Sequence, residues 1–169
     1  LVASSTGGGG VVVEEEDRRA ATRAGFGNDG GTIILPGDCT GERGASEYLA
    51  RSHGLTIGAP PRCDLDGERR LIDLLLDCGR AGWIVSAHDC SDGGFAVALA
   101  ECAMLERDKQ VGVDVDLSDW AHLSARALLF GEAQGRIIVS TTAPGDVLAA
   151  ARTGHVPARV IGRVGAPDG

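Results

Sequence analysis

Residues 86–94 gather most of the side chains in this chain that could bind an anion and its metal. Their sequence is Ser-Ala-His-Asp-Cys-Ser-Asp-Gly-Gly, between a strand-like Trp-Ile-Val run and a helix-like apolar run. A strand-to-helix turn presents backbone N–H groups to a phosphate, while a carboxylate can hold the accompanying Mg²⁺. The carboxylate of Asp89 could therefore bind the cation, and the hydroxyl of Ser91 could contact the same phosphate.

The same turn has a structural interpretation without a ligand. Asp92 could cap the helix that is predicted to begin near Gly93, accepting hydrogen bonds from the N–H groups of the first turn. Gly93 and Gly94 each cost about 1 kcal/mol against alanine inside a helix, which favours a role in letting a ligand approach the backbone. His88 could act as a general base, but a hydrogen bond within the turn is the favoured interpretation. The residues alone leave the choice between a capped turn and a phosphate site open.

Two further segments place polar side chains beside predicted helices or strands. Residues 129–136, Leu-Phe-Gly-Glu-Ala-Gln-Gly-Arg, join a predicted helix to a strand, so Glu132, Gln134 and Arg136 could bind a polar ligand. Equally, Glu132 and Arg136 could form an ion pair, which contributes little to stability when exposed. Residues 41–49, Gly-Glu-Arg-Gly-Ala-Ser-Glu-Tyr-Leu, predict a turn into a short helix. Each of these signals is weak on its own.

The composition favours one folded domain and argues against two kinds of partner. Of the 169 residues, 43% are hydrophobic but only 4% aromatic, so we expect a core of Leu, Ile, Val and Ala. The net charge of −8, with no basic stripe or aromatic platform, argues against a nucleic-acid partner. No apolar run approaches the roughly 20 residues that span a bilayer, and residues 1–6 lack the residue order of a signal peptide. We therefore expect no membrane partner.

The five cysteines indicate reduced thiols. Their number is odd and no two have Cys-x-x-Cys spacing, so we expect neither a disulfide framework nor a zinc site. Cys78 and Cys102 fall in helix-like segments, where cysteine packs as a small apolar residue. This pattern favours a cytoplasmic protein.

Apolar spacing predicts helices and strands that alternate along the chain. Helices are expected over residues 46–51, 66–80, 92–105, 124–130 and 144–152, and strands over 32–35, 84–87, 111–115, 136–141 and 159–164. Such alternation predicts an α/β class, with a layered mixed sheet covered by helices. Residues 1–31 contain a glycine run and lack a strong apolar stripe, so we expect a poorly ordered lead-in to a domain over residues 32–169.

In their order and spacing, the motifs resemble the C-terminal part of the phosphoribosylformylglycinamidine synthases, within the aminoimidazole ribonucleotide synthetase superfamily. The matching blocks are residues 41–49, 86–101, 129–136 and 157–162, and the resemblance runs from about residue 32 to residue 164. The block over residues 86–94 is the most specific of them. The resemblance implies the C-terminal domain of the second of two tandem halves, with the mixed α/β fold of that domain.

The resemblance also implies an activity, cofactors and partners. The family forms an amidine from formylglycinamide ribonucleotide, ATP and glutamine-derived ammonia, with Mg²⁺ neutralising charge on the transferred phosphoryl group. The partners implied are the missing synthetase domains or a second copy, and a glutaminase component. In large family members the aspartate matching Asp89 binds Mg²⁺, and the serine matching Ser91 contacts an auxiliary nucleotide, ATP or ADP. The segment matching residues 132–134 has a substrate-binding counterpart, which makes Glu132 and Gln134 candidate substrate contacts.

No catalytic residue is expected in this chain, because the family's catalytic histidine and most of its metal carboxylates lie in other domains. Ala133 stands where the family usually has serine, which removes a hydroxyl from the substrate segment. We therefore expect a C-terminal fragment of the synthase that is inactive alone. The alternative is a non-catalytic scaffold domain that binds no ligand.

Overall fold

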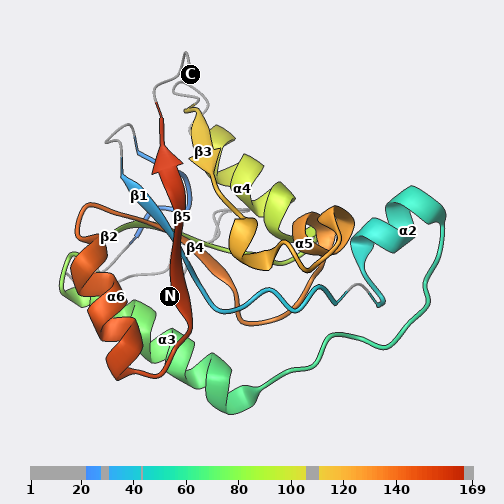
Figure 1. The fold of residues 1–169 in the computed structure, drawn as a ribbon, viewed down its shortest axis with the longest axis horizontal. Coiled ribbons are helices and arrows are strands. Elements are labelled where there is room, and N and C mark those ends of the chain that lie inside the picture. Colours follow the sequence, from blue (N-terminus) through green and yellow to red (C-terminus); the bar gives the residue numbers. More distant parts are fainter. Residues whose placement is uncertain (1–21, 28–30, 43, 106–110, 166–169) are drawn as a thin grey trace, which may run out of the picture.

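The computed structural model describes residues 22–27, 31–42, 44–105 and 111–165. These residues form a domain in which helices cover both faces of one sheet (Figure 1). The arrangement confirms the predicted α/β class, because strands and helices alternate along the chain as the apolar spacing indicated.

Within the described residues, the sheet has five strands in the order β2-β4-β1-β5-β3, and every neighbouring pair is antiparallel. The strands are β1 (Thr32–Pro36), β2 (Ile84–Asp89), β3 (Val113–Val115), β4 (Ile137–Thr141) and β5 (Ala158–Val164). Strand β2 ends two residues later than predicted, because His88 and Asp89 still pair with β4. Asp89 therefore ends a strand instead of lying in the turn.

Alternate residues of the two central strands point to opposite faces of the sheet and build two separate cores. Ile33 and Leu35 of β1 lie in one core, and Ile34 lies in the other. In β4, Ile138 and Val139 are divided in the same way. All five side chains are fully buried, so the central strands are covered on both faces.

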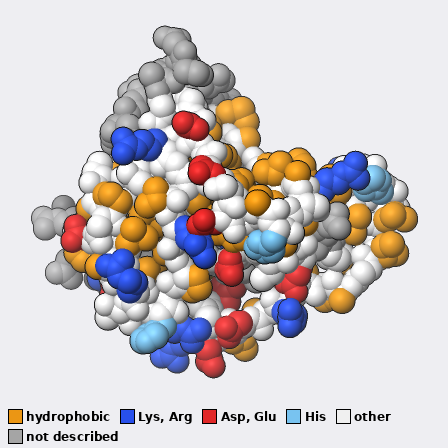
Figure 2. All heavy atoms as spheres, in the orientation of Figure 1, with side chains coloured by type: hydrophobic (Ala, Val, Ile, Leu, Met, Phe, Trp, Pro, Cys, Tyr) orange, Lys and Arg blue, Asp and Glu red, His pale blue; other side chains and the backbone are white. Residues whose placement is uncertain are grey.

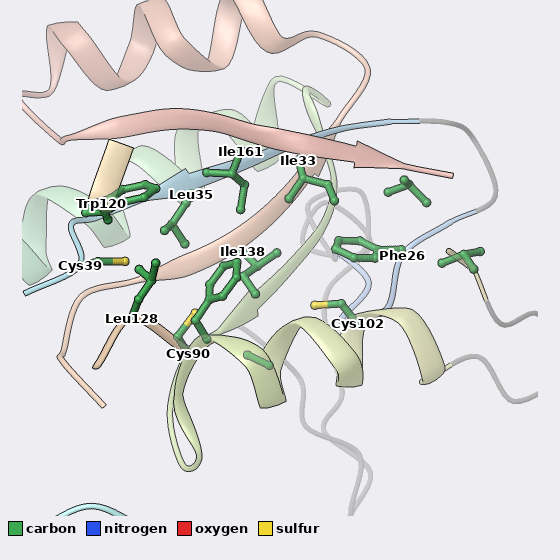
Figure 3. Close-up of a cluster of buried hydrophobic side chains, with 14 residues drawn as sticks. Phe26, Ile33, Leu35, Cys39, Cys90, Cys102, Trp120, Leu128, Ile138 and Ile161 are labelled. Carbon is green, nitrogen blue, oxygen red and sulfur yellow. The ribbon is translucent and has the colours of Figure 1, made fainter. Parts of the chain in front are cut away.

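Helices α4 (Gly94–Met104) and α5 (Ala125–Phe130), with the short 3-10 helix η1 (Ser118–Trp120), cover the first core. Figure 3 shows this core between the sheet and α4, with Phe26 and Cys102 at one end and Trp120 and Cys39 at the other. Phe95, Ala98 and Cys102 of α4 all face it, as their helical spacing predicted.

Helices α3 (Leu65–Arg80) and α6 (Pro144–Thr153) lie side by side over the second core (Figure 1). Leu71, Leu74 and Cys78 give α3 one apolar stripe at helical spacing, and that stripe is buried. Pro144 occupies the first turn of α6, where its missing N–H has no helical partner to lose. None of the described helices is long and apolar enough to cross a membrane.

Helix α2 (Glu47–His53) stands apart from both helix layers and has no buried residue (Figure 1). It begins as predicted at Ser46, whose side chain accepts a hydrogen bond from the N–H of Leu49 at 3.3 Å. It ends at Gly54, which adopts the left-handed conformation with φ of 63°. A largely exposed linker over residues 54–64 then leads to α3.

Part of the predicted lead-in packs on the domain. Phe26 is 2% exposed in the first core, and its N–H donates to the carbonyl oxygen of Cys102 at 2.8 Å. Arg23 forms a parallel bridge with Ser86 of β2. Burial of one phenylalanine contributes about 1.5–3 kcal/mol, which explains why these residues are attached although their segment lacks a stripe. Residues 1–21 and 28–30 lie outside the described residues, and the domain boundary at residue 32 stays a prediction.

Candidate functional site

The three sequence segments with candidate site residues meet at one side chain, that of Glu132. Its Oε1 accepts hydrogen bonds from the main-chain N–H groups of Gly93 and Glu47, each at 2.9 Å. The N–H of Glu132 donates in turn to the carbonyl oxygen of Glu42 at 3.0 Å. We call this set of contacts the Glu132 junction. Its partners lie 39 and 85 residues from Glu132, so the junction exists only in the folded chain.

In the glycine pair at the start of α4, Gly94 lets the helix lie directly against the chain before Glu132. Gly93 and Gly94 have φ of 83° and 75°, in the left-handed region that favours glycine. A Cβ on Gly94 would lie 2.6 Å from the carbonyl oxygen of Gly131 and 2.9 Å from the carbonyl carbon of Phe130. The close approach that the glycine pair predicted is therefore made by the chain's own backbone.

The capping of α4 differs from the prediction. The N-cap residue is Gly93, no side-chain cap bond is present, and the side chain of Asp92 is exposed. The negative charge at this helix start is the carboxylate of Glu132 instead of that of Asp92. A negative charge near a helix N-terminus contributes about 0.3–1 kcal/mol. The N–H of Gly94 donates to the carbonyl oxygen of Ser91 at 3.0 Å. Both N–H groups of the glycine pair thus have acceptors within the chain.

Arg136 supports the loop that carries Glu132. Its side chain is buried, with 3% exposure. Nη2 donates to the carbonyl oxygen of Gly131 at 2.6 Å and Nε to that of Ala133 at 3.2 Å, while Nη1 lies 3.6 Å from Sγ of Cys39. The alternative of a Glu132–Arg136 ion pair is wrong, because the guanidinium binds main-chain carbonyls and the carboxylate binds main-chain N–H groups.

The thiols around Arg136 are held in their protonated form. Burial raises the pKa of the Cys39 thiol, and the hydrogen bond from Arg136 lowers it only in part. Burial likewise raises the pKa of the Cys90 thiol to about 12, against a smaller lowering by the Arg136 charge. A thiol needs its thiolate form to act as a nucleophile, so these cysteines serve packing.

Asp89 and Ser91, the predicted metal and phosphate contacts, lie at the surface beside the junction. The side chain of Asp89 is 56% exposed at the end of β2, and Ser91 is exposed two residues later. Between β2 and α4, the ring of His88 has Nδ1 2.8 Å from the carbonyl oxygen of Asp89 and Nε2 3.2 Å from Oε2 of Glu101. With both ring nitrogens engaged, the structural interpretation of His88 is favoured over the general base.

The chemistry at Asp89 suits one ligand of a Mg²⁺ ion. Mg²⁺ in proteins is commonly held by one or two carboxylates together with waters and substrate phosphates. Within the described residues, no group of three or more His, Cys, Asp or Glu could hold a metal ion. Asp89 offers one exposed carboxylate of this kind.

Gln134, the second candidate substrate contact, lines an open hollow of about 690 Å³. Charged side chains that include Glu42, Arg62 and Glu68 also line this hollow. Asp89 is not among the residues that line this hollow. On the face shown in Figure 2, acidic and basic side chains are interspersed and form no patch of one sign. The structure thus brings Glu132 to the glycine pair but places Gln134 in the hollow.

The sequence interpretation missed two features of this site. One is the role of Glu132 as the acceptor for two helix starts, for which no spacing in the sequence is diagnostic. The other is the burial of Arg136. The sequence held a usable signal for it, because an arginine directly before the apolar run of β4 lies at the edge of a core. Both features depend on which segments pack together.

An antiparallel sheet with helices on both faces, and an α4 that starts against the Gly131–Glu132 segment, define an α/β domain with a composite turn at one helix start. A model of the family "AIR synthase related protein, C-terminal domain" matches residues 28–169. The chain belongs to this family, which confirms the resemblance found in the sequence.

Among characterised relatives, the chain is similar to the phosphoribosylformylglycinamidine synthase subunit PurL of Moorella thermoacetica. The two are 43% identical over 143 residues, which is 83% of this chain and 19% of the relative. The chain therefore spans about a fifth of the length of the curated relatives it matches.

Solved structures of Thermotoga maritima PurL show the same fold. The structure complexed with FGAR has a TM-score of 0.73 at 22% identity, over 87% of this chain and 26% of that one. The structure complexed with ATP has a TM-score of 0.66 at 20% identity, over 87% of this chain and 23% of that one. At these identities the likeness concerns the fold.

Proposed function

We propose that this chain supplies the C-terminal domain of an ATP-dependent, amidine-forming ligase of purine biosynthesis, a phosphoribosylformylglycinamidine synthase. The observation that carries the proposal is the 43% identity to a PurL subunit over 83% of the chain. It is supported by the meeting of three family-like segments at the Glu132 junction. The likeness to PurL structures complexed with ATP and with FGAR supports a nucleotide-using enzyme.

Within that enzyme, Asp89 contributes a carboxylate to Mg²⁺ and Ser91 contributes a hydroxyl to a phosphate of ATP or ADP. Both side chains are exposed beside the start of α4, where a ligand held by another domain can reach them. Gly94 positions this turn through its close approach to Gly131. Magnesium supplies charge neutralisation for the phosphates when it is bound.

The isolated chain is expected to be inactive. It spans about a fifth of the length of its relatives, and within the described residues no group of three or more His, Cys, Asp or Glu could hold a metal ion. Its partners are the missing synthetase domains or a second copy, together with a glutaminase component that supplies ammonia. The working enzyme is a cytoplasmic assembly.

The second candidate function is a non-catalytic scaffold domain without a ligand. Two observations favour it: Ala133 lacks the hydroxyl that is usual in the family, and both N–H groups of the glycine pair already have acceptors. In that case the chain would stabilise the larger enzyme without contacting nucleotide.

A chimera separates the two functions. The C-terminal segment of the Moorella thermoacetica relative is replaced by this chain, and ATP-dependent amidine formation and retained nucleotide are measured. Asp89→Asn should lower nucleotide retention by at least about tenfold, because it removes a charged metal ligand of the same shape. Asp92→Asn, an exposed acid three residues away, is the matched control and should change nothing. Retention that is unchanged in Asp89→Asn would refute the nucleotide site and favour the scaffold. A folded chimera without activity would refute the synthase assignment.

A further inference from the structure

Two helices from different parts of the fold begin at the same carboxylate oxygen. Oε1 of Glu132 accepts the N–H of Glu47, the first residue of α2, and the N–H of Gly93, the N-cap residue of α4. The first N–H groups of a helix have no partner within the helix, and the helix dipole makes them favourable neighbours for a negative charge. One anion thus serves two positive helix ends.

Among the described residues, helix α2 is attached to the body of the domain at a second point, through its aromatic ring. None of its residues is buried. Its Tyr48 ring stacks on Phe130 with centroids 5.1 Å apart and planes at 14°. Phe130 lies two residues before Glu132, so both attachments lead to the same short segment. That segment also seats α4, through the close approach of Gly94 to Gly131.

We infer that Glu132 is a positioning residue that couples the placement of α2 to the turn over residues 90–94, which follows Asp89. Movement of α2 away from the domain breaks the bond to Glu47, so the side chain of Glu132 is held by fewer contacts and positions Gly93 less firmly. Displacement of the turn acts on α2 in the same way, because coupling between two sites is reciprocal. The coupling stands on geometry alone; its relevance to Asp89 and Ser91 rests on the proposed function.

Amide exchange, followed by NMR on the full chain without nucleotide, tests the coupling. Glu132→Ala removes the acceptor of both N–H groups, so exchange at Glu47 and at Gly93 should accelerate by about tenfold or more. Glu132→Gln keeps an acceptor oxygen of the same reach but loses the charge, so it should restore part of the protection at both amides. A residue that only filled space would show no such recovery at these two amides.

Two control variants test whether the effect runs through Glu132. Ser46→Ala removes the side-chain cap of α2 and should accelerate exchange within α2. If the coupling exists, exchange at Gly93 should also rise by about twofold or more, because the α2 end of the link is loosened. Asp92→Ala, next to Gly93 but without a cap bond, should leave the protection factors of both amides, corrected for the intrinsic effect of the neighbouring side chain, unchanged.

Three outcomes would overturn the inference. Acceleration at Glu47 alone in Glu132→Ala would make Glu132 a cap of α2 only, and acceleration at Gly93 alone would make it a cap of α4 only. An unchanged Gly93 in Ser46→Ala would show two independent bonds. If Glu132→Ala does not fold, the comparison of Glu132→Gln with the parent decides, since partial loss at both amides is then expected. The readout needs no nucleotide, so the result is independent of the Asp89→Asn test.

Discussion

Nη2 of Arg136 donates to the carbonyl oxygen of Gly131 at 2.6 Å, and this bond joins the start of β4 to the end of α5. The same guanidinium also binds the carbonyl oxygen of Ala133. Arg136 therefore joins the two ends of the loop over residues 131–136, which carries Glu132. Since the side chain is buried, its hydrogen bonds are protected from competing water.

Replacing Arg136 should strongly destabilise the domain. Arg136→Ala leaves two buried carbonyl oxygens without this donor, so the free energy of unfolding in urea should fall by about 2–4 kcal/mol. Arg80→Ala is the control, because the ion pair of Arg80 with Asp77 at 3.3 Å is exposed, and its loss should lower the free energy of unfolding by at most about 0.5 kcal/mol. Equal effects of the two variants would contradict a structural role for Arg136.

Gly94→Ala should lower the free energy of unfolding by more than the left-handed backbone conformation of Gly94 alone explains. Gly82 and Gly94 have nearly the same φ, 72° and 75°, but a Cβ at Gly82 would meet nothing within 4 Å. Gly82→Ala should therefore cost only the left-handed strain of about 1–2 kcal/mol. Gly94→Ala adds a clash with the backbone at Gly131, which should lower the free energy of unfolding by about 1–3 kcal/mol more. Urea unfolding of the pair checks this, and equal costs would show that the contact is not tight.

Stability should fall with rising pH above about 9, because buried thiols resist ionisation. Burial raises the pKa of Cys90 and of Cys102 from 9.0 to about 12. Between these values the unfolded chain releases protons that the folded chain keeps, so unfolding becomes easier as the pH rises. Each thiol should remove about 1.4 kcal/mol of unfolding free energy per pH unit in this window.

Cysteine variants identify the source of this pH dependence. The double variant Cys90→Ala and Cys102→Ala should flatten the decline in unfolding free energy between pH 9 and pH 11. Cys63→Ala is the control, because Cys63 is exposed and should leave the slope as it is. A slope that does not change in the double variant would place the titrating groups elsewhere.

The isolated chain should self-associate through exposed apolar side chains. Val97, Met104 and Leu105 lie on the outer side of α4 or at its end, and they are 37%, 53% and 50% exposed. Apolar side chains that gather on one surface commonly mark an interface. Sedimentation velocity should show dimers or larger species that decrease in a Met104→Lys and Leu105→Lys double variant. Ile72→Lys, on α3, is the control, and a monodisperse parent monomer would contradict the expectation.

Much of the fold follows from apolar spacing along the chain. Strands β1, β4 and β5 and helices α3 and α6 lie within two residues of their predicted bounds. Their side chains repeat with the period of a strand or a helix, because each must bury one or both faces against the sheet. Ser46 was likewise predictable as a cap, since its acceptor and the N–H of Leu49 are three residues apart.

The errors cluster where a local interaction competes with a distant one. Asp92 was a sound candidate to cap α4 by sequence, yet the carboxylate at this helix start is that of Glu132, 39 residues from Gly93, whose N–H it accepts. Phe26 was assigned to a loose lead-in, yet it is buried beside Cys102. In each case tertiary packing brought a partner that local spacing could not reveal.

The amino-acid sequence by itself determined the elements, the two-faced sheet and the family of this chain, because these depend on periodic burial and on ordered motifs. Tertiary structure alone decided that the three motifs meet at Glu132 and that Arg136 is buried. The physical reason is that the N–H group at a helix start, and the guanidinium of an arginine, bind whichever acceptor packing brings within about 3 Å. That choice is made by the folded chain as a whole.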